Sequence, residues 1–368
     1  MKTAMGLIMT NYSDGNFDSL IADRPIATLP FGGRYRMVDF PMSNMVNSRI
    51  TTVGIITPYK YRSLMDHLGA GKEWMLNRKV GGMFFLPGSI YGVKNERHSK
   101  FLLRDILQNK AYLERGEGEL VVVTGSNKIY NMDYREVCRI HEESGADVTL
   151  IYKPNNVGCE APENYLTVDE NGKVTAISAD AGETANCFMD AFVINRELLL
   201  KFMSWYGALD YMDMLDIFED SIDKVNIRAY AFEGYLGSVN GLKSFMRANQ
   251  DLLDPEVRRE LFLSDNPIKT KVQDSAPAKY LPSAEIKNSM ISTGCTIGGS
   301  VENSILFRGA NVAPGAVVKN CIIMQKCDIQ EGAVLENCIV DKYVTISAGS
   351  KVIGNVDSPI AIGKRQNV

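Results

Sequence analysis

Short apolar runs rich in β-branched residues alternate with helical patterns over the first two thirds of the chain. The runs cover residues 4–9, 51–57, 120–125 and 147–152. Apolar residues recur with the period of an amphipathic helix over residues 102–116, 134–146, 195–207 and 211–223. This alternation predicts an α/β domain with a mostly parallel sheet covered by helices. Ligands of such sheets bind at the carboxyl ends of the strands.

The pattern changes twice after residue 252. Residues 253–282 contain four prolines and no sustained period, which indicates a linker. Beyond the linker, four sets of positions repeat every 17 residues: Asn303, Asn320 and Asn337; Ile305, Ile322 and Ile339; Val312, Ile329 and Ile346; Gly315, Gly332 and Gly349. An aliphatic residue every five or six positions predicts a triangular parallel β-helix of hexapeptide type, whose stacked coils bury the aliphatic side chains.

Chain length and composition favour a two-domain protein of the cytoplasm. With 368 residues, the chain exceeds the ~100–200 residues of one domain, so we expect domains at 1–252 and 283–368. A net charge of -4 gives no reason to expect nucleic acid or an anionic membrane as a partner. The first apolar run is too short for a signal peptide, and no run approaches ~20 apolar residues. We therefore expect a cytoplasmic protein.

Cysteines and histidines suggest no chemistry of their own. The seven cysteines form no CxxC pair and have no histidine at zinc-finger spacing, so we expect free thiols. Acyltransferases built on hexapeptide coils use a histidine base. Because His67, His98 and His141 all lie in the first domain, we expect the β-helix to have a structural or subunit-contact role.

Residues 29–57, LPFGGRYRMVDFPMSNMVNSRITTVGIIT, resemble the nucleotide-sugar pyrophosphorylases, most closely the glucose-1-phosphate adenylyltransferases. The resemblance continues through residues 59–68, 129–134, 247–253, 268–280 and the β-helix. It implies a Rossmann-like nucleotidyltransferase domain at 1–252, followed by a left-handed parallel β-helix at 283–368. The implied reaction joins ATP and glucose 1-phosphate into ADP-glucose and pyrophosphate, with cations and Mg²⁺ neutralising the developing charge.

The phosphate loop of that family does not match this chain. Its glycines let backbone N–H groups approach the triphosphate, and its arginine adds charge. In this chain the glycines fall on Asn11, Tyr12 and Asp14, and the arginine falls on Asn16. Residues 3–23 contain no lysine or arginine, so a triphosphate would meet no positive side chain there.

The second cation and both metal carboxylates are also replaced. The family's lysine position is Ile26; Arg24 matches an arginine that the family already has. The metal aspartates fall on Asn127, which Lys128 follows, and on Ser238. A neutral amide is a poor ligand for Mg²⁺, and a neighbouring ammonium opposes a dication.

Two further landmarks differ as well. The glucose-1-phosphate motif EKP is replaced by SADAG at residues 178–182, and the glycine of a GTADA-like segment falls on Phe101. Loss of one preorganised donor typically costs ~10²–10³ in rate. The departures together predict a catalytically deficient chain with no metal or other cofactor of its own.

The pattern is typical of a regulatory subunit that assembles with a catalytic adenylyltransferase subunit, as a heterotetramer, in glycogen synthesis. Mg²⁺ would then belong to the catalytic partner. Family enzymes respond to anionic metabolites, and the basic residue after FGG contributes to the effector site in bacterial members. The resemblance therefore assigns effector binding to Arg34 and the nearby Arg36.

Two alternatives stay open. An active pyrophosphorylase could use relocated metal ligands, for which Asp14, Asp190 and Asp213 are available. A sensing module could instead bind a nucleotide or sugar phosphate without any catalytic partner.

Overall fold

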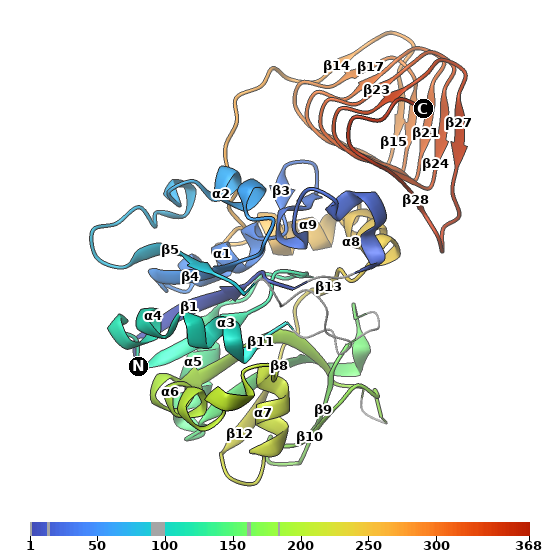
Figure 1. The fold of residues 1–368 in the computed structure, drawn as a ribbon. Helices are drawn as coiled ribbons and strands as arrows, with labels where there is room; N and C mark the ends of the chain where they lie inside the picture. The colour runs from blue at the N-terminus through green and yellow to red at the C-terminus, as the bar shows by residue number, and fades with distance from the viewer. Residues whose placement is uncertain (1, 13–14, 90–99, 160–162, 183–184) are drawn as a thin grey trace.

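The structure is a computed structural model that describes residues 2–12, 15–89, 100–159, 163–182 and 185–368. It consists of an α/β domain and a β-helix beside it (Figure 1). The elements of the first domain are β1 (Ala4–Met9), η1 (Gly15–Ile21), η2 (Ile26–Thr28), β2 (Pro30–Phe31), β3 (Tyr35–Arg36), α1 (Asp39–Asn47), β4 (Thr52–Thr57), α2 (Arg62–Leu68), η3 (Lys72–Trp74), β5 (Gly82–Pro87), α3 (Leu103–Gln108), α4 (Lys110–Arg115), β6 (Leu120–Thr124), β7 (Lys128–Ile129), α5 (Tyr134–Glu143), β8 (Val148–Lys153), η4 (Pro154–Asn156), β9 (Tyr165–Val168), β10 (Val174–Ser178), β11 (Cys187–Asn195), α6 (Arg196–Trp205), η5 (Gly207–Leu209), α7 (Met214–Asp220), β12 (Ile227–Ala231), β13 (Gly237–Ser238), α8 (Leu242–Asp251) and α9 (Pro255–Phe262).

The main sheet is mixed. Its order is β10-β9-β11-β6-β1-β4-β5, and β8 pairs with both β11 and β12. The pairs β6-β1, β1-β4, β4-β5 and β12-β8 are parallel, whereas β11 runs antiparallel to both β6 and β8. The expectation of a mostly parallel sheet is therefore wrong around β11. The chain reaches β11 through the β9-β10 hairpin, and a strand entered without a crossover helix can run antiparallel.

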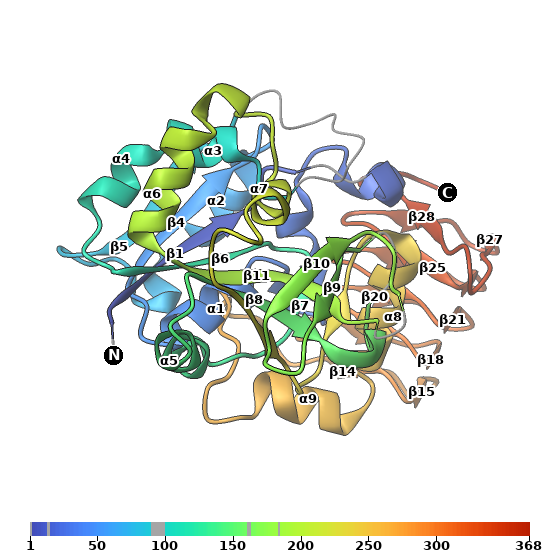
Figure 2. The same cartoon turned by 90° about the horizontal axis from the view of Figure 1, so that it is seen from below.

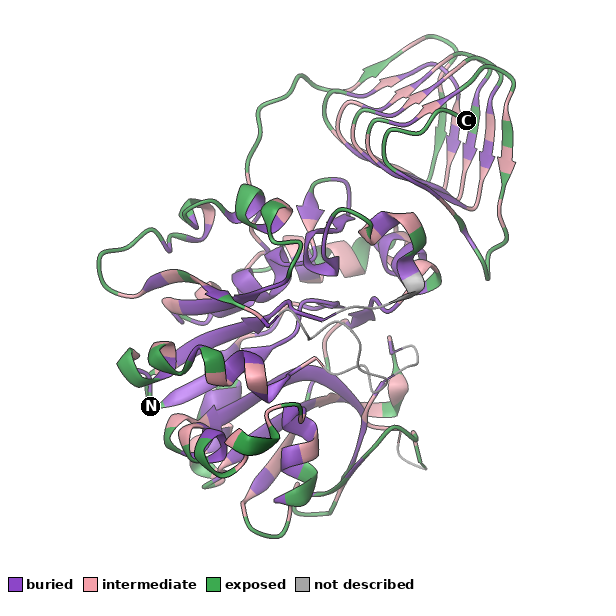
Figure 3. Cartoon of the chain, viewed as in Figure 1, coloured by how far each residue is buried: buried purple, intermediate pink, exposed green. Residues whose placement is uncertain are grey.

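Helices cover both faces of this sheet (Figure 2). Side chains of α3, α4, α6 and α7 form one apolar core with one face of β1 and β6. Side chains of α1, α2 and α5 form a second core with the opposite face. Figure 3 shows the central strands buried between these layers. The predicted strands are confirmed as β1, β4, β6 and β8, and the predicted helix at 102–116 is two short helices that meet at Asn109.

The second domain is the left-handed parallel β-helix. Its strands are β14 (Lys279–Tyr280), β15 (Glu285–Lys287), β16 (Met290–Ile291), β17 (Thr296–Ile297), β18 (Ser300–Glu302), β19 (Ile305–Leu306), β20 (Asn311–Val312), β21 (Val317–Lys319), β22 (Ile322–Ile323), β23 (Asp328–Ile329), β24 (Val334–Glu336), β25 (Cys338–Val340), β26 (Thr345–Ile346), β27 (Lys351–Ile353) and β28 (Ile360–Ile362). They form three parallel five-stranded sheets, which confirms the hexapeptide prediction.

The asparagines of the 17-residue repeat lie at corners of the β-helix. Asn303, Asn320 and Asn337 have φ values of 47°, 50° and 52°. Asparagine tolerates this left-handed conformation better than most residues, because its short polar side chain bonds locally. Asn320 donates a 3.3 Å hydrogen bond to Asn337 in the next coil, so the repeat fixes both corner geometry and stacking.

The isoleucine set of the repeat is not buried inside the stacked coils, as the sequence pattern predicted, but at the surface of the β-helix that contacts the first domain. Ile305, Ile322 and Ile339 lie in a cluster with Phe245 and Leu252 of the first domain. Their strand neighbours Leu306, Ile323 and Val340 fill the interior of the β-helix instead. Successive side chains of a strand point to opposite faces, so the isoleucines are buried by docking against the first domain.

Three further features complete the fold. The segment interpreted as a linker contains α9 and β14, and its Leu261 and Ile268 are buried. Cys159 and Cys187 form a disulfide, so the expectation of free thiols is wrong for this pair; the other five cysteines are free and buried. No helix in the described residues is long and apolar enough to cross a membrane.

Candidate functional site

The two positions that correspond to metal aspartates come together in the fold. Asn127 follows the carboxyl end of β6 and directly precedes β7. Ser238 lies in β13, where it pairs with Lys128 of β7. Both side chains are buried, and the amide of Asn127 donates a 2.8 Å hydrogen bond to the side-chain oxygen of Asn240. The predicted positions therefore share one site at the carboxyl edge of the sheet.

A cluster of four buried charges occupies this site. The Nζ atom of Lys128 contacts a carboxylate oxygen of Glu163, lies 2.6 Å from Oγ of Ser238 and lies 3.7 Å from Oδ2 of Asp190. The Nζ atom of Lys100 lies 2.6 Å from the same Asp190 oxygen and 3.9 Å from Oε2 of Glu163. We call Lys100, Lys128, Glu163 and Asp190 the charge cluster. None of their side chains is more than 9% exposed.

Mutual attraction favours the charged forms of Glu163 and Lys100 in the charge cluster. Burial alone would raise the pKa of Glu163, but the ammonium groups of Lys128 and Lys100 hold that pKa below its usual value. Burial would likewise lower the pKa of Lys100, but the carboxylates of Asp190 and Glu163 raise it above its usual value. The site therefore pairs two lysines with two acidic side chains.

Asp190 is held in a strained backbone conformation. Its φ is 52°, and it lies where the pairing of β11 with β8 shifts register between Phe188 and Phe192. Residues other than glycine rarely adopt this conformation inside a strand, and such strain persists only where its surroundings enforce it. The backbone N–H of Gly125 donates a 2.8 Å hydrogen bond to the Asp190 carbonyl, which fixes the bulge against the end of β6.

Side chains of the former phosphate loop fill the space beside the charge cluster. Tyr12, at a family glycine position, is 8% exposed. Its hydroxyl group lies 2.8 Å from Oγ of Ser126, and burial raises the pKa of this phenol well above its usual value. Asn11, at another glycine position, donates a 2.7 Å hydrogen bond to Asp105. Side chains thus occupy positions where glycine would leave the backbone accessible.

The remaining sequence landmarks do not contribute charge to this site. Ile26 is buried in the apolar cluster between the domains. Phe101 packs edge-on against Phe192, with ring centroids 5.4 Å apart. Asp14 and the side chain of Asn16 lie outside the described residues.

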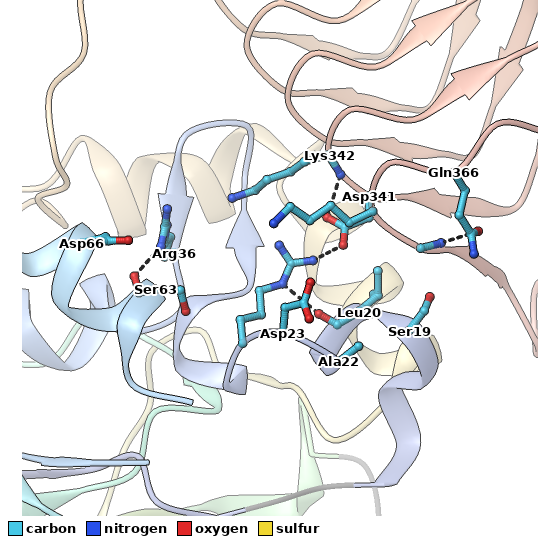
Figure 4. A pocket seen from close by; sticks show the side chains of 13 residues that line it. Ser19, Leu20, Ala22, Asp23, Arg36, Ser63, Asp66, Asp341, Lys342 and Gln366 are labelled. Atoms are coloured by element: carbon cyan, nitrogen blue, oxygen red, sulfur yellow. Dashed lines mark hydrogen bonds and ion pairs between the residues drawn. The ribbon is translucent and has the colours of Figure 1, made fainter. Parts of the chain in front are cut away.

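A cavity of about 300 Å³ lies between the two domains (Figure 4). It is lined by Ser19, Leu20, Ala22, Asp23, Arg24, Arg36, Ser63, Asp66, Asp341, Lys342, Gly363, Lys364 and Gln366. We call it the interdomain cavity. Four of these residues are basic and three are acidic, so positive charge is in excess. Lys342 extends from the β-helix toward Arg36 of the first domain.

The structure separates the two arginines predicted to bind an effector. Arg36 lines the interdomain cavity and donates a 2.9 Å hydrogen bond to the Ser63 carbonyl. Arg34 is exposed, lies over the ring of Tyr35 and does not line this cavity. Arg24, which the sequence left without a role, forms an ion pair with Asp341 across the domain interface.

Lys342 in the interdomain cavity has a lowered pKa. Burial lowers its pKa, and the nearby positive charges of Arg36 and Arg24 lower it further, to about 7, against the opposing effect of Asp341. An anion in the cavity would offset this repulsion and favour the charged ammonium.

Comparison with known proteins identifies the family. Residues 20–179 match the family described as Nucleotidyl transferase, and residues 276–358 match the one described as GlmU-like, C-terminal hexapeptide. The Glucose-1-phosphate adenylyltransferase of Clostridium perfringens (strain 13) is 31% identical over 332 residues, which are 86% of this chain and 82% of that protein. The chain belongs to the glucose-1-phosphate adenylyltransferase family.

Two proteins named Glycogen biosynthesis protein GlgD are similar to this chain over most of its length. The protein of Bacillus subtilis (strain 168) is 33% identical over 98% of this chain and 95% of its own length. The protein of Geobacillus stearothermophilus is 35% identical over 82% of this chain and 78% of its own length. The resemblance inferred from residues 29–57 is confirmed.

The adenylyltransferase site of this chain does not fit the Mg²⁺ that the family resemblance implies. Asn127 offers a neutral amide and Ser238 a hydroxyl group, while the ammonium of Lys128 already contacts the nearest carboxylate. Among the described residues, no group of three or more His, Cys, Asp or Glu side chains could hold a metal ion. Of the alternative ligands, Asp190 is paired with Lys100, and Asp213 accepts a 2.9 Å hydrogen bond from Leu215 N as the N-cap of α7.

Lys100 and Glu163 were not among the site residues predicted from the sequence. Neither matches a landmark of the adenylyltransferase family, and they lie 63 positions apart in the chain. One sequence signal pointed to them. Lys128 is a cation next to a lost metal ligand, and a buried charge needs a partner, so a compensating carboxylate was to be expected nearby.

Proposed function

We propose that this chain is a regulatory, catalytically deficient subunit of a glucose-1-phosphate adenylyltransferase in glycogen biosynthesis. It would assemble with a catalytic subunit, most plainly as a heterotetramer, and modulate that subunit's synthesis of ADP-glucose. The similarity to proteins named Glycogen biosynthesis protein GlgD and to adenylyltransferases supports this assignment.

The observation that carries the proposal is the charge cluster. Adenylyl transfer needs cations that are free to neutralise the phosphates and carboxylates that are free to hold Mg²⁺. In this chain the ammonium groups of Lys100 and Lys128 are paired with Glu163 and Asp190. This pairing supports the proposed catalytic deficiency.

The interdomain cavity supports the regulatory part of the proposal. Arg36 and Lys342 come from different domains and line the same space, so an anion between them would tie the β-helix to the first domain. Such a ligand favours whichever domain arrangement brings the two charges together, and it can shift a two-state equilibrium by that difference in affinity. A coupling of ~1–3 kcal/mol changes a partner's apparent affinities 5–150-fold.

The test is a kinetic titration of a catalytic subunit that keeps aspartates at the positions of Asn127 and Ser238. Pyrophosphate release is measured at increasing ratios of this chain, with and without inorganic phosphate as the anion probe. We expect a change in the maximal rate or in substrate half-saturation that levels off at a fixed ratio. Unchanged kinetics at every ratio would contradict the proposal.

Two charge-removing variants separate the cavity from general electrostatics. R36Q is expected to reduce the response to phosphate, whereas K351Q, which removes an exposed charge of β27 outside the cavity, is the matched control. R34Q tests whether the exposed arginine also takes part. If R36Q and K351Q respond alike, the cavity is not the anion site.

A further inference from the structure

We propose that the ammonium group of Lys128 is a built-in replacement for the divalent cation of this family, and that it must leave before a metal can bind. This inference rests on the proposed loss of catalysis but concerns the chain's own site. It predicts that restoring the two lost aspartates alone leaves metal binding weak, and that removing Lys128 as well makes it tighter.

The surroundings of Lys128 are those of a bound cation. Its Nζ atom faces oxygen atoms of three side chains: a carboxylate of Glu163, the hydroxyl of Ser238 at 2.6 Å and a carboxylate of Asp190 at 3.7 Å. An ammonium group has three N–H donors and no acceptor, so three oxygens can surround it as they would surround a metal ion. Ser238 is itself one of the former ligand positions.

Charge balance explains why one lysine does not act alone. A dication carries two positive charges, and Lys128 supplies one. Lys100 supplies the second from the other side of Asp190, 2.6 Å from its Oδ2 atom. With Glu163 and Asp190 neutralised in this way, a metal ion would meet two ammonium groups and no unpaired carboxylate within the cluster.

The backbone of Asp190 is an independent indication that the carboxylate is required at this position. A φ of 52° favours glycine, yet an aspartate occupies the bulge and is 1% exposed. Glycine would relieve the strain but would leave both lysines with one carboxylate fewer. The strain is therefore offset by the ion pairs that Asp190 makes with Lys100 and Lys128.

One atom of the cluster retains unused acceptor capacity. Oε2 of Glu163 is buried and has no hydrogen-bond partner among the described residues; the Nζ atom of Lys100 lies 3.9 Å from it. Once Lys128 is removed and Ser238 is replaced, Oε1 of Glu163 keeps a 2.7 Å hydrogen bond from Asn240, and Oε2 is available together with the restored side chains at 127 and 238. The site then offers three carboxylates close to one point, which suits a hard dication.

The experiment measures Mn²⁺ binding to the full chain by electron paramagnetic resonance, without nucleotide or partner subunit. The variants are wild type, N127D/S238D, N127D/S238D/K128A and the matched control N127D/S238D/K110A. Lys110 is a half-exposed lysine of α4 paired with Glu114, so its loss changes net charge equally. We expect K128A to tighten Mn²⁺ binding of the double variant about 10–100-fold, a range typical of changes around metal ligands, and K110A to leave it unchanged.

Comparable Mn²⁺ affinity in N127D/S238D and N127D/S238D/K128A would overturn the inference, as would no Mn²⁺ binding in the folded triple variant. If circular dichroism shows that the K128A variant is unfolded, N127D/S238D/K128Q replaces it, because glutamine keeps a donor to Glu163. The same tightening is expected. This assay contains no catalytic subunit, so its outcome is distinct from the kinetic titration that tests the proposed function.

Discussion

Replacing Lys128 by methionine removes one ammonium group while it keeps a side chain of similar length. Glu163 and Asp190 are then left with Lys100 as their only partner in the charge cluster. Both carboxylates are at least 98% buried, so water does not compensate the loss. Breaking a buried pair by removing one partner costs ~3–5 kcal/mol, a large share of the ~5–15 kcal/mol that stabilises a typical folded protein.

The assay is urea unfolding followed by far-ultraviolet circular dichroism, on K128M, E163Q and K128M/E163Q. The second substitution neutralises the carboxylate that K128M leaves without its lysine, so the double variant is expected to lose less than the sum of the single losses. A coupling energy of ~1–3 kcal/mol is the expected size for groups in one network. K110M, at the exposed pair with Glu114, is expected to cost less than ~1 kcal/mol.

A loss of stability in K128M no larger than that in K110M would contradict this expectation. Additive losses in K128M and E163Q would contradict it as well, because the two side chains would then not depend on each other. Either result would mean that the ammonium of Lys128 is not held as a partner of the buried carboxylates.

Three further outcomes follow from the same structure. Between pH 5 and pH 3, wild type should lose more stability than E163Q. The folded pKa of Glu163 is lowered, so this carboxylate stabilises the fold above its unfolded pKa of about 4.3, and the stabilisation is lost as the pH falls through the folded pKa. Urea unfolding midpoints across this pH range measure the difference. Sulfate, whose charge is constant, should bind the interdomain cavity up to about tenfold more weakly per pH unit above 7, because Lys342, with a pKa of about 7, loses its charge there. Calorimetry measures sulfate affinity for wild type and K342M, and K342M should show no such pH dependence. Asn320 lies at a corner of the β-helix with a φ of 50°. N320A should lower the unfolding free energy by ~1–2 kcal/mol and N320G by less, because alanine is strained in this conformation and glycine is not. Equal losses would contradict the idea that this corner selects its residue by backbone conformation.

Much of the fold was predictable because it depends on local periodicity. β-branched runs identified β1, β4, β6 and β8, and the 17-residue repeat identified the β-helix. The repeat could not say which aliphatic residue of each coil faces outward. Two adjacent apolar positions, such as Ile322 and Ile323, satisfy the same pattern, and the presence of the first domain decides which one it buries.

The candidate site was predictable only as a set of losses. Asn127 and Ser238 could be read as replaced ligands because a motif fixes each position. No sequence motif identifies Glu163 or Lys100, and long-range packing of the sheet brings these two side chains together. The Cys159–Cys187 disulfide was missed for a similar reason, since sequence spacing alone does not determine which cysteines pair.

We infer that internal ion pairs have replaced the metal and phosphate chemistry at this site. To test this claim, the purified chain alone is incubated with Mg²⁺, ATP and glucose 1-phosphate, and pyrophosphate release is followed over many equivalents of enzyme. We predict no release above the uncatalysed background. Sustained turnover by the chain alone, abolished by D190N or D213N, would contradict the claim and support an active pyrophosphorylase with relocated ligands.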